Sequence, residues 1–496
     1  MLIIHNPPQS ERLYRKCTVS VNGQIAPTPE VRVSAMPYNT AWPGYQRPLD
    51  QTETAPLLML EADEDVRITV TYKYAPSEVL IRPLIRGVDA TIKGNTATFT
   101  LTCAGAYTVE ADGFHEALHI FLNPIRNFKE RTSLAKTVLR YGAGVHNIGN
   151  VELFSNTTVI IDRDAYLYGS FFAAGANNIS ICGYGVIDGG GDIRGEDTRL
   201  IPHSYDFAWP SERAELISAL EKYNVQKGIL RFYNCKGIRV EGVCLRDAST
   251  FAAVMANCTD IVLDNIKTVG MWKYNSDGID LFNSSDAVIR NCFLRNFDDC
   301  IALKGICGWD YWNLENILVE KCVTWCDWGR NLEIGAETNA PAYRNIIFRD
   351  CDCIHGSTIF CDIQHHNCAD ICNVTFEDIR CEYTKHQLGD VYQEDMNKPY
   401  PYTLKHPVLC GAFIYDMGLF SKNRHNGNIH DITFRNITVI HDSDGIPNPE
   451  IILQGISEEY KVRRVCIDNI NKNGKRLTAY EMKISRNQFV DDVTVS

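Results

Sequence analysis

Three aspartates, whose spacing puts them at one end of two matching segments, are the residues of this chain best placed for chemistry. Asp277 directly precedes GIDL (278–281), and Asp298 and Asp299 directly precede CIAL (300–303). When these two segments are aligned, Asp277 and Asp299 share a column and are 22 residues apart. In adjacent strands these carboxyl groups lie roughly 5 Å apart per strand step. Like charges so close cannot all ionise freely, so one pKa is expected to rise toward that of a general acid. One such Asp would be ordinary turn chemistry, but three in register favour acid–base catalysis.

The elements that must position these aspartates repeat along the chain. Short strand-like pieces start with an apolar residue and then alternate polar with apolar residues, as in IRVEGV, IVLDNI and ILVEKC. Neighbouring starts lie 23 to 30 residues apart, except the last interval of 58, which is twice 29. Periods in this range mark a solenoid, and the alternation fits a coil of a parallel β-helix better than a helical repeat. The pieces start at Ile238, Ile261, Ala287, Ile317, Ile346, Val374 and Ile432.

The sixth position of each piece accounts for part of the cysteine content. Cysteine alternates there with isoleucine and valine, so it behaves as a small buried hydrophobe in an interior ladder. The chain has 19 cysteines, an odd number that suits reduced thiols better than a framework of disulfides. The residues at the sixth position are Val243, Ile266, Cys292, Cys322, Cys351, Ile379 and Ile437.

The chain before the repeats has the pattern of antiparallel strands. Residues 66–72 (VRITVTY) alternate apolar with polar side chains, and so do residues 98–103 (TFTLTC), which predicts strands with one buried face. A helix is expected in SERAELISALEKY, within an insertion at 189–229. The predicted fold class is all-β. We assign 1–122 to a β-sandwich accessory domain, 123–140 to a charged linker and 141–496 to a parallel β-helix.

The composition excludes several classes of protein. In 496 residues, 45% are hydrophobic and 22% are charged, which is a globular balance and not that of a disordered or collagen-like chain. The net charge of −12 disfavours nucleic acid as a partner. No stretch reaches the roughly 18 to 20 apolar residues that span a bilayer, so we expect no membrane partner. The start MLIIHNPPQSERLYRK lacks the apolar core of a signal peptide, and a cytoplasmic location is expected.

Four segments resemble the polygalacturonase family, glycoside hydrolase family 28. The resemblance covers roughly 141–365, and Asn-x-Asp-Gly followed by Asp-Asp is its most specific part. It implies a right-handed parallel β-helix and an inverting hydrolase. A β-sandwich ahead of such a helix is also similar to the dextranase family. The segments are YGAGVHNIGNVELFSNTTVIIDRDAYLYGSF (141–171), ISICGYGVIDGGGD (179–192), NSDGIDLFNSSDAVIRNCFLRNFDDCIALKG (275–305) and GRNLEIG (329–335).

The resemblance also implies roles for the three aspartates. Asp298 would protonate the leaving-group oxygen, while Asp277 and Asp299 would position and deprotonate water on the opposite face of the sugar, as inversion requires. Trp328 belongs to a group of aromatic residues around the carboxylates that could stack on sugar rings. No cofactor is expected. The candidate substrate-binding residues are Asn275, Lys304, Trp328, Arg330, Glu333, Asp362, Gln364 and His365.

Two departures from the family pattern bear on the substrate. The family's Gly-His-Gly is replaced here by Gly329-Arg330-Asn331, and its Arg-Ile-Lys, which binds a galacturonate carboxylate, is replaced by Asp362-Ile363-Gln364. Arg330 could hold Asp299 ionised, grip a sugar hydroxyl or form a plain structural ion pair. A site built for a uronate would not place an acid at Asp362. We therefore predict exo-acting hydrolysis of an oligosaccharide that is neutral or only partly uronic.

A second group of residues has the types that bind metals. Their density raises a zinc hypothesis, but Cys351 belongs to the ladder position, and neither paired CxxC nor HxxxH spacing occurs, so no metal site is predicted. The group consists of Cys351, Cys353, His355, Cys361, His365, His366, Cys368 and Cys372.

Three alternative functions remain open from the sequence. The first is hydrolysis of galacturonides, as the family resemblance implies. The second is a β-helical polysaccharide lyase in which carboxylates hold calcium and Arg330 abstracts a proton. The third is a glycan-binding β-helix without catalysis. The sequence does not determine the oligomeric state.

Overall fold

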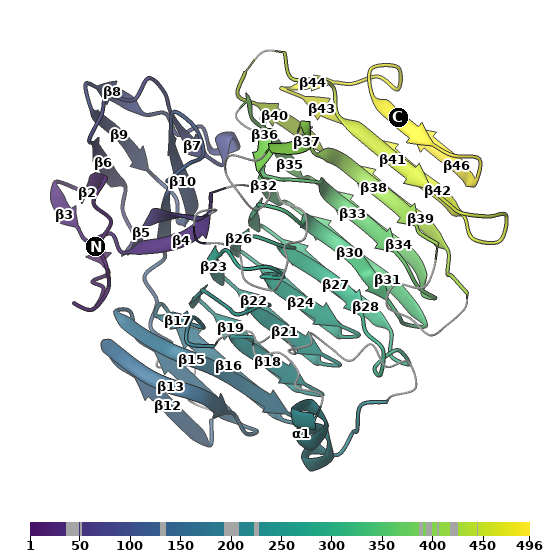
Figure 1. Cartoon of the computed structure of the whole chain (residues 1–496), viewed down its shortest axis with the longest axis horizontal. Coiled ribbons are helices and arrows are strands. Elements are labelled where there is room, and N and C mark those ends of the chain that lie inside the picture. Colours follow the sequence, from purple (N-terminus) through teal and green to yellow (C-terminus); the bar gives the residue numbers. More distant parts are fainter. Residues whose placement is uncertain are drawn as a thin grey trace.

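The computed structural model describes residues 1–35, 49, 52–128, 135–192, 208–222, 228–385, 390–392, 399–403, 406–416, 425–443 and 445–496. Within them, a pair of N-terminal sheets stands beside a long stack of parallel strands (Figure 1). The stack follows the sequence order from its first strands to the C-terminus (Figure 1). No helix in the described part of the chain is long and apolar enough to cross a membrane.

The N-terminal sheets form the predicted β-sandwich. Their alternating side chains meet in one core, which contains Leu58 and Ile120 from one sheet and Ile68 and Phe99 from the other. The first sheet contains β1 (Leu2–Ile4), β4 (Glu30–Ser34), β5 (Thr52–Ala62), β7 (Val79–Arg82), β10 (Gly105–Ala111) and β11 (Leu118–Asn123). The second contains β2 (Cys17–Val21), β3 (Gln24–Ala26), β6 (Val66–Tyr72), β8 (Thr91–Lys93) and β9 (Thr96–Leu101). A 3₁₀-helix, η2, spans Leu84–Arg86.

One long sheet of the parallel β-helix has 12 strands. Every neighbouring pair in it is parallel, so each strand belongs to a new coil. Its strands are β12 (Thr137–Tyr141), β14 (Thr157–Ile161), β16 (Asn177–Gly183), β19 (Lys236–Glu241), β22 (Thr259–Asp264), β25 (Ser285–Arg290), β28 (Leu314–Glu320), β31 (Ala342–Arg349), β34 (Asp370–Glu377), β39 (Ile429–Arg435), β42 (Val462–Asp468) and β46 (Val490–Val495).

The other long sheet has 21 strands and folds around the remaining sides of the coils. It begins with β13 (Gly144–Glu152) and β15 (Ala165–Ala174), and β15 pairs with both later rows of strands. The row that carries the site comprises β18 (Leu230–Tyr233), β21 (Ala253–Ala256), β24 (Ile279–Phe282), β27 (Ile301–Gly305), β30 (Arg330–Thr338), β33 (Ile359–His365), β38 (Val408–Ile414), β41 (Glu450–Gln454) and β45 (Lys483–Arg486). The row before it comprises β17 (Val186–Asp188), β20 (Cys244–Arg246), β23 (Lys267–Met271), β26 (Phe293–Asn296), β29 (Val323–Cys326), β32 (Asp352–His355), β35 (Arg380–Tyr383), β40 (Thr438–His441) and β43 (Asn471–Lys472).

Four short elements lie outside the coils or end them. β44 (Lys475–Arg476) pairs with β43, and β36 (Asp390–Tyr392) pairs with β37 (Pro399–Thr403) in a two-stranded ribbon. The expected helix is α1 (Arg213–Lys222), which buries Leu216.

The residues at equivalent positions of the predicted repeat are paired with one another in the 12-stranded sheet. Cα partners join Ile238 to Ile261, Ile261 to Ala287, and so on without a slip to Val374 and Ile432. The interval of 58 residues is a single coil with a long insertion and not two coils, because β34 pairs directly with β39. The cysteine prediction is also confirmed: all 19 cysteines are free thiols, and Cys292, Cys322 and Cys351 are buried in the core of the coils.

Asparagine and aspartate make the corners of the coils possible. At one corner, Asn265, Asn291, Asp350 and Asn436 have φ between 52° and 57°, the left-handed region that these residues tolerate best. Their side chains also link neighbouring coils, as when Asn436 donates to Asp378 at 2.9 Å. The corner composition is therefore part of what fixes the repeat.

The predicted linker at 123–140 is too long at its C-terminal end. The first strand of the stack, β12, begins at Thr137. It lies at the edge of the stack, has no buried side chain and carries Arg140, which pairs with Asp162 at 2.9 Å. An exposed edge strand has a polar composition, which is why its sequence is similar to that of a linker.

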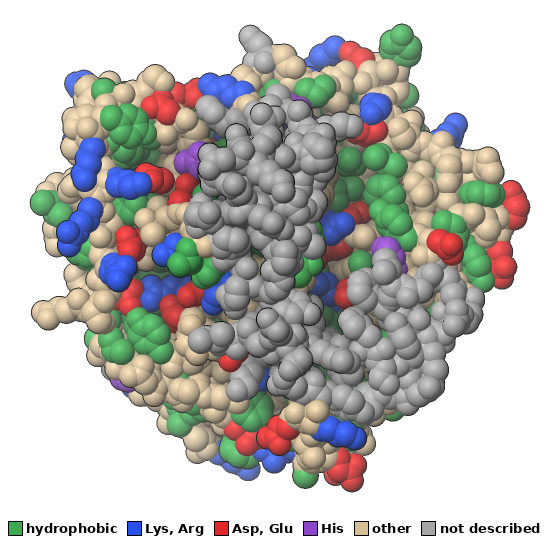
Figure 2. All heavy atoms as spheres, viewed as in Figure 1, with side chains coloured by type: hydrophobic (Ala, Val, Ile, Leu, Met, Phe, Trp, Pro, Cys, Tyr) green, Lys and Arg blue, Asp and Glu red, His purple; other side chains and the backbone are tan. Residues whose placement is uncertain are grey.

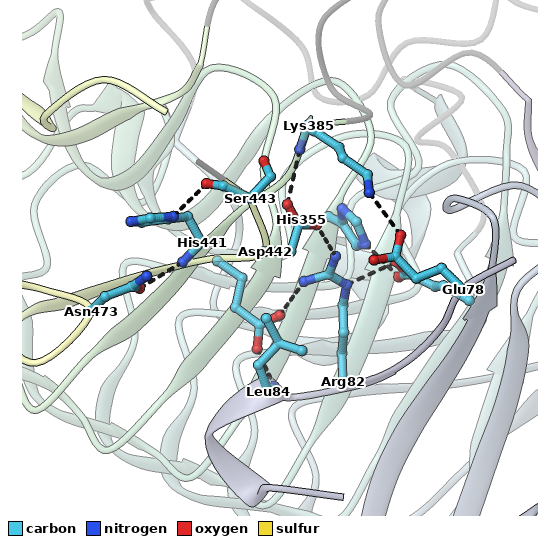
Figure 3. A network of polar contacts seen from close by, with 11 residues as sticks. Glu78, Arg82, Leu84, His355, Lys385, His441, Asp442, Ser443 and Asn473 are labelled. Atoms are coloured by element: carbon cyan, nitrogen blue, oxygen red, sulfur yellow. Dashed lines mark hydrogen bonds and ion pairs between the residues drawn. The ribbon is translucent and has the colours of Figure 1, made fainter. Parts of the chain in front are cut away.

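The sandwich docks on the row of strands before the site. Arg82 of β7 is fully buried and contacts Glu110 of its own domain at 2.8 Å, and Glu382 and Asp442 of the coils at 2.5 and 3.0 Å (Figure 3). Glu110 also contacts His355 of β32 at 2.6 Å. An apolar cluster lies in the same interface and includes Val31, Leu57, Met59, Phe121, Val269, Phe293, Val323 and Trp325.

Candidate active site

Asp277 and Asp299 lie in one column at the turns that lead into β24 and β27, and Asp298 directly precedes Asp299. Asp277 precedes β24, and Asp298 and Asp299 fill the turn between β26 and β27. Ile279 pairs with Ile301, and Ile301 pairs with Leu332, so the strands have the register predicted from GIDL, CIAL and NLEI. All three carboxyl groups are buried, with 2%, 4% and 6% of the residue exposed.

Lys304 of β27 points its ammonium group at the carboxylates. Its Nζ lies 2.6 Å from Asp277, 3.1 Å from Asp280 and 3.6 Å from Asp299. Burial lowers the pKa of Lys304, but the carboxylates outweigh this effect and raise the pKa above its ordinary value. Lys304 is therefore a permanent cation inside the site.

Asp298 and Asp299 are adjacent in the chain but have opposite tendencies to ionise. Burial raises the pKa of Asp298 to about 8, and the charge of Asp299 adds to this effect. Burial also acts against ionisation of Asp299, yet Lys304 and Arg330 outweigh it and lower the pKa of Asp299. The backbone N–H of Arg330 donates to Asp299 Oδ1 at 3.0 Å and favours the same ionised form. Near neutral pH, the turn thus offers one proton donor and one proton acceptor.

Arg330 faces one carboxyl group of its own strand and one of the next coil. Its Nε lies 3.4 Å from Asp362 and 3.8 Å from Glu333, which are Cα partners on β33 and β30. Burial raises the pKa of Asp362 to about 7 and that of Glu333 well above its ordinary value. Arg330 therefore contacts Glu333 and Asp362 through its guanidinium, and Asp299 through its backbone N–H.

His365, predicted to bind substrate, lies inside the coil. It shares a face with Cys361 and Ile363, both core residues, and it is fully buried with Nδ1 2.7 Å from Thr338 Oγ1. The period of two places His366 on the outer face with Gln364 instead, and the two side-chain nitrogens lie 3.1 Å apart. The prediction of His365 as a cleft residue is wrong for this reason.

Two groups of aromatic side chains flank the site. The ring of Trp328 is parallel to that of Phe297 at 5.7 Å, and Tyr274 lies 5.9 Å from it. On the later coils, His366 stacks on Tyr415 at 4.4 Å. No pattern in the sequence singles out Tyr415, because it follows β38 and reaches His366 through the stacking of coils. Asn275 lies beside the acid, with Nδ2 3.5 Å from Asp298 Oδ2.

The residues of metal-binding type between 351 and 372 are dispersed in the fold. Cys351, Cys353 and Cys361 are core residues, and His355 contacts the sandwich. Among the described residues, one group has donor atoms within 4.8 Å of one another and could hold a metal ion: Asp370, Cys372 and His430. It lies on the 12-stranded sheet, apart from the three aspartates.

Comparison with protein families gives a match to the model of glycosyl hydrolases family 28 over residues 130–395. Among curated relatives, a probable exopolygalacturonase X of Aspergillus terreus is 26% identical over 183 residues, which are 35% of this chain and 37% of that protein. An exopolygalacturonase of Cochliobolus carbonum is 24% identical over 183 residues, or 36% and 34% of the two chains. The matches thus span little more than a third of these relatives.

Solved structures share the fold over a larger part of the chain. Dex49A from Penicillium minioluteum superposes with a TM-score of 0.59 at 12% identity, covering 99% of this chain and 96% of that one. The family 28 exopolygalacturonase of Yersinia enterocolitica has a TM-score of 0.52 at 15% identity, covering 86% and 96%. At such identities the similarity concerns the fold alone.

Proposed function

The chain belongs to family 28 of the glycosyl hydrolases, and from this premise we propose that it hydrolyses an oligosaccharide with inversion at the anomeric carbon. The observation that carries the proposal is the buried turn of Asp298 and Asp299 with Asp277 beside them, in which burial raises the pKa of Asp298 while Lys304 and Arg330 lower that of Asp299. An inverting hydrolase needs one protonated and one ionised carboxyl group at its bond-cleaving centre.

The proposed reaction uses the three aspartates in one step. Asp298 gives its proton to the glycosidic oxygen as the bond from that oxygen to the anomeric carbon breaks. A water molecule held by Asp277 and Asp299 attacks the anomeric carbon from the other face, and its proton passes to one of these carboxylates. The products are a hemiacetal of inverted configuration and the free alcohol, and later proton exchange with solvent restores the enzyme.

We propose a neutral or only partly uronic glycan as the substrate. The support is the charge beside the aspartates: Arg330, a cation available to a uronate, already contacts Glu333 and Asp362. A sugar carboxylate bound there would meet two acids, whereas sugar hydroxyls can donate to them. Exo action is supported by relatives that are named exopolygalacturonases. A cytoplasmic location is supported by the 19 free thiols, which suit a reducing compartment.

Hydrolysis of galacturonides is the second candidate, and the names of the relatives favour it. The lyase and the glycan-binding alternatives have less support, because the family is one of hydrolases and Lys304 occupies the place among the carboxylates that calcium would need. Lys, Arg, Asp and Glu side chains are interspersed on the face seen in Figure 2, the pattern of an ordinary solvated surface and not of a nucleic-acid interface.

The test compares matched aryl galactosides and aryl galacturonides. We expect a higher kcat/KM for the neutral glycoside, because Glu333 and Asp362 already occupy the guanidinium of Arg330 that a uronate would need. The configuration of the first-formed product, followed by NMR, is expected to be inverted. A clear preference for the galacturonide would overturn the substrate proposal, and retention of configuration would overturn the mechanism.

A further inference from the structure

Lys304 reaches carboxylates that come from different coils. Asp277 and Asp280 belong to the coil of β24, and Asp299 leads into β27, the strand of Lys304 itself. Building on the proposed function, we infer that Lys304 is a positioning residue that favours the ionised forms of Asp277 and Asp299 for the attack of water, while Asp298 serves as the proton donor.

The surroundings of Lys304 leave its ammonium group no other role. The side chain is 7% exposed, and its Nζ lies 5.0 Å from the ring centroid of Phe251. An ammonium group has three donor hydrogens, and three carboxylates lie around it. Among buried groups, a cation this close favours the ionised carboxylate strongly. Lys304 thus acts on the substrate only through the aspartates.

Asp280 explains why a lysine stays in place there. Asp280 is fully buried. Within the described residues, it forms an ion pair with Lys304 at 3.1 Å. Neither of its oxygens accepts a hydrogen bond from a described residue. Asp280 stands in the column of Ala302 and Glu333, behind the turn that carries the catalytic groups. It therefore anchors the ammonium group together with Asp277 and Asp299.

The other charged groups near Lys304 act in both directions. Burial holds the pKa of Asp277 well above its ordinary value, Lys304 lowers it, and the nearby carboxyl groups of Asp280 and Asp298 raise it. Glu337 of β30 is close enough to raise the pKa of Lys304 further. Asp298 feels Lys304 and Arg330 at longer range, which lowers its pKa, but burial and Asp299 outweigh both. Among the ion pairs of the described residues, none joins Lys304 to Asp298. The distances from Lys304 Nζ therefore distinguish Asp277 and Asp299, which form ion pairs with it, from Asp298, which does not.

The experiment replaces Lys304 by methionine and records kcat/KM against pH. Without the cation, Asp277 and Asp299 hold protons to a higher pH. The acidic limb of the kcat/KM profile is therefore expected to move up by at least one pH unit, and kcat/KM at pH 6 is expected to fall 100-fold or more. Lys304→Arg restores a cation and is expected to return the limb toward its original place. Lys267→Met is the matched control, because Lys267 is a buried lysine that contacts Asn123 and Gly242 and not the aspartates.

A second readout does not depend on turnover. Loss of Lys304 raises the pKa of buried carboxyls in the folded protein, and a raised pKa lowers stability as pH rises from the unfolded value toward the folded one. The melting temperature of Lys304→Met, relative to the original protein, is therefore expected to fall between pH 5 and pH 8. Because Lys304→Met leaves Asp280 unpaired, the double variant Lys304→Met/Asp280→Asn serves if the single variant does not fold.

The outcomes distinguish the two proposals. An unmoved acidic limb with a raised KM would overturn the inference and make Lys304 a substrate-binding residue. A melting temperature whose pH dependence matches that of the original protein would overturn it as well. Absence of hydrolysis by the original protein on every glycoside would overturn the proposed function, while the pH dependence of melting would still decide whether Lys304 keeps the aspartates ionised.

Discussion

In the proposed mechanism, Asp298 acts as the acid and Asp299 as a base within one turn, although their side chains are chemically identical. The difference comes from partners: Asp299 receives the backbone N–H of Arg330 and the charges of Lys304 and Arg330, whereas Asp298 has mainly burial and a negative neighbour. A carboxyl group kept protonated near neutral pH can act as a general acid. Position within the turn, and not residue type, thus assigns the roles.

Replacement of Asp298 by asparagine tests this assignment at the residue scale. Asparagine keeps the shape but has no proton to give, so activity is expected to fall by about 100-fold or more on a glycoside with a poor leaving group. On an activated aryl glycoside, which leaves without acid help, the loss is expected to be much smaller. Steady-state kinetics on both substrates measure the difference.

The control is the pair of variants Asp277→Asn and Asp299→Asn. They remove the groups that handle water, so both substrates are expected to suffer alike. Near-normal turnover of the poor-leaving-group substrate by any of the three variants would remove that aspartate from the mechanism.

At the scale of elements, the coil interior is built from ladders that accept cysteine in place of isoleucine. Cys292, Cys322 and Cys351 occupy the position that Val243 and Ile266 hold in earlier coils, and all are buried. Burial raises the pKa of Cys322 well above its ordinary value. A thiol in this state is a weak nucleophile, because the thiolate is the reactive form.

Thiol labelling of the native protein tests the ladder. Cys103, which is exposed in the sandwich, is expected to react at once with a bulky reagent. Cys292, Cys322 and Cys351 are expected to react only on the timescale of unfolding, and peptide mass spectrometry assigns each site. Rapid modification of a ladder cysteine in the native state would contradict its place in the interior, and labelling in denaturant serves as the positive control.

At the scale of the whole molecule, the sandwich is held to the coils by buried charge as well as by apolar packing. Arg82 is surrounded by Glu110, Glu382 and Asp442, which come from both domains (Figure 3). Burial raises the pKa of Glu382 to about 7 although Arg82 acts against it. The interface therefore depends on the guanidinium to keep three carboxyl groups compensated.

Arg82→Met is the test of the interface. Removing one partner of a buried ion pair typically costs about 3–5 kcal/mol, because the remaining charge is left uncompensated. Calorimetry is expected to show a lower melting temperature, with the deficit growing as pH rises and the carboxyl groups ionise. Arg67→Met, at an exposed position of β6, is the control and is expected to leave melting unchanged. Equal melting of both variants would show that the apolar cluster alone holds the domains.

The sequence by itself determined the features that follow from the repeat. The alignment of the repeat from Ile238 to Ile432, the cysteine ladder and the column of Asp277, Asp299 and Arg330 all appear in the structure as predicted, although the strands begin two to four residues before the predicted starts. The hydrogen-bond ladder ties each residue to its equivalent one coil later. The alternation of faces within β33 was also legible in the sequence and would have placed His366, and not His365, on the outside.

Tertiary structure decided the contacts that cross the ladder. The three partners of Lys304 and the pairing of Arg330 with Glu333 and Asp362 depend on how long side chains reach between coils and on what is buried around them. Contacts such as Glu110 with His355 join residues 245 positions apart, and no local pattern encodes them. Periodicity fixes neighbours along the stack, whereas burial and side-chain reach fix charge partners, and those partners determine which aspartate carries the proton.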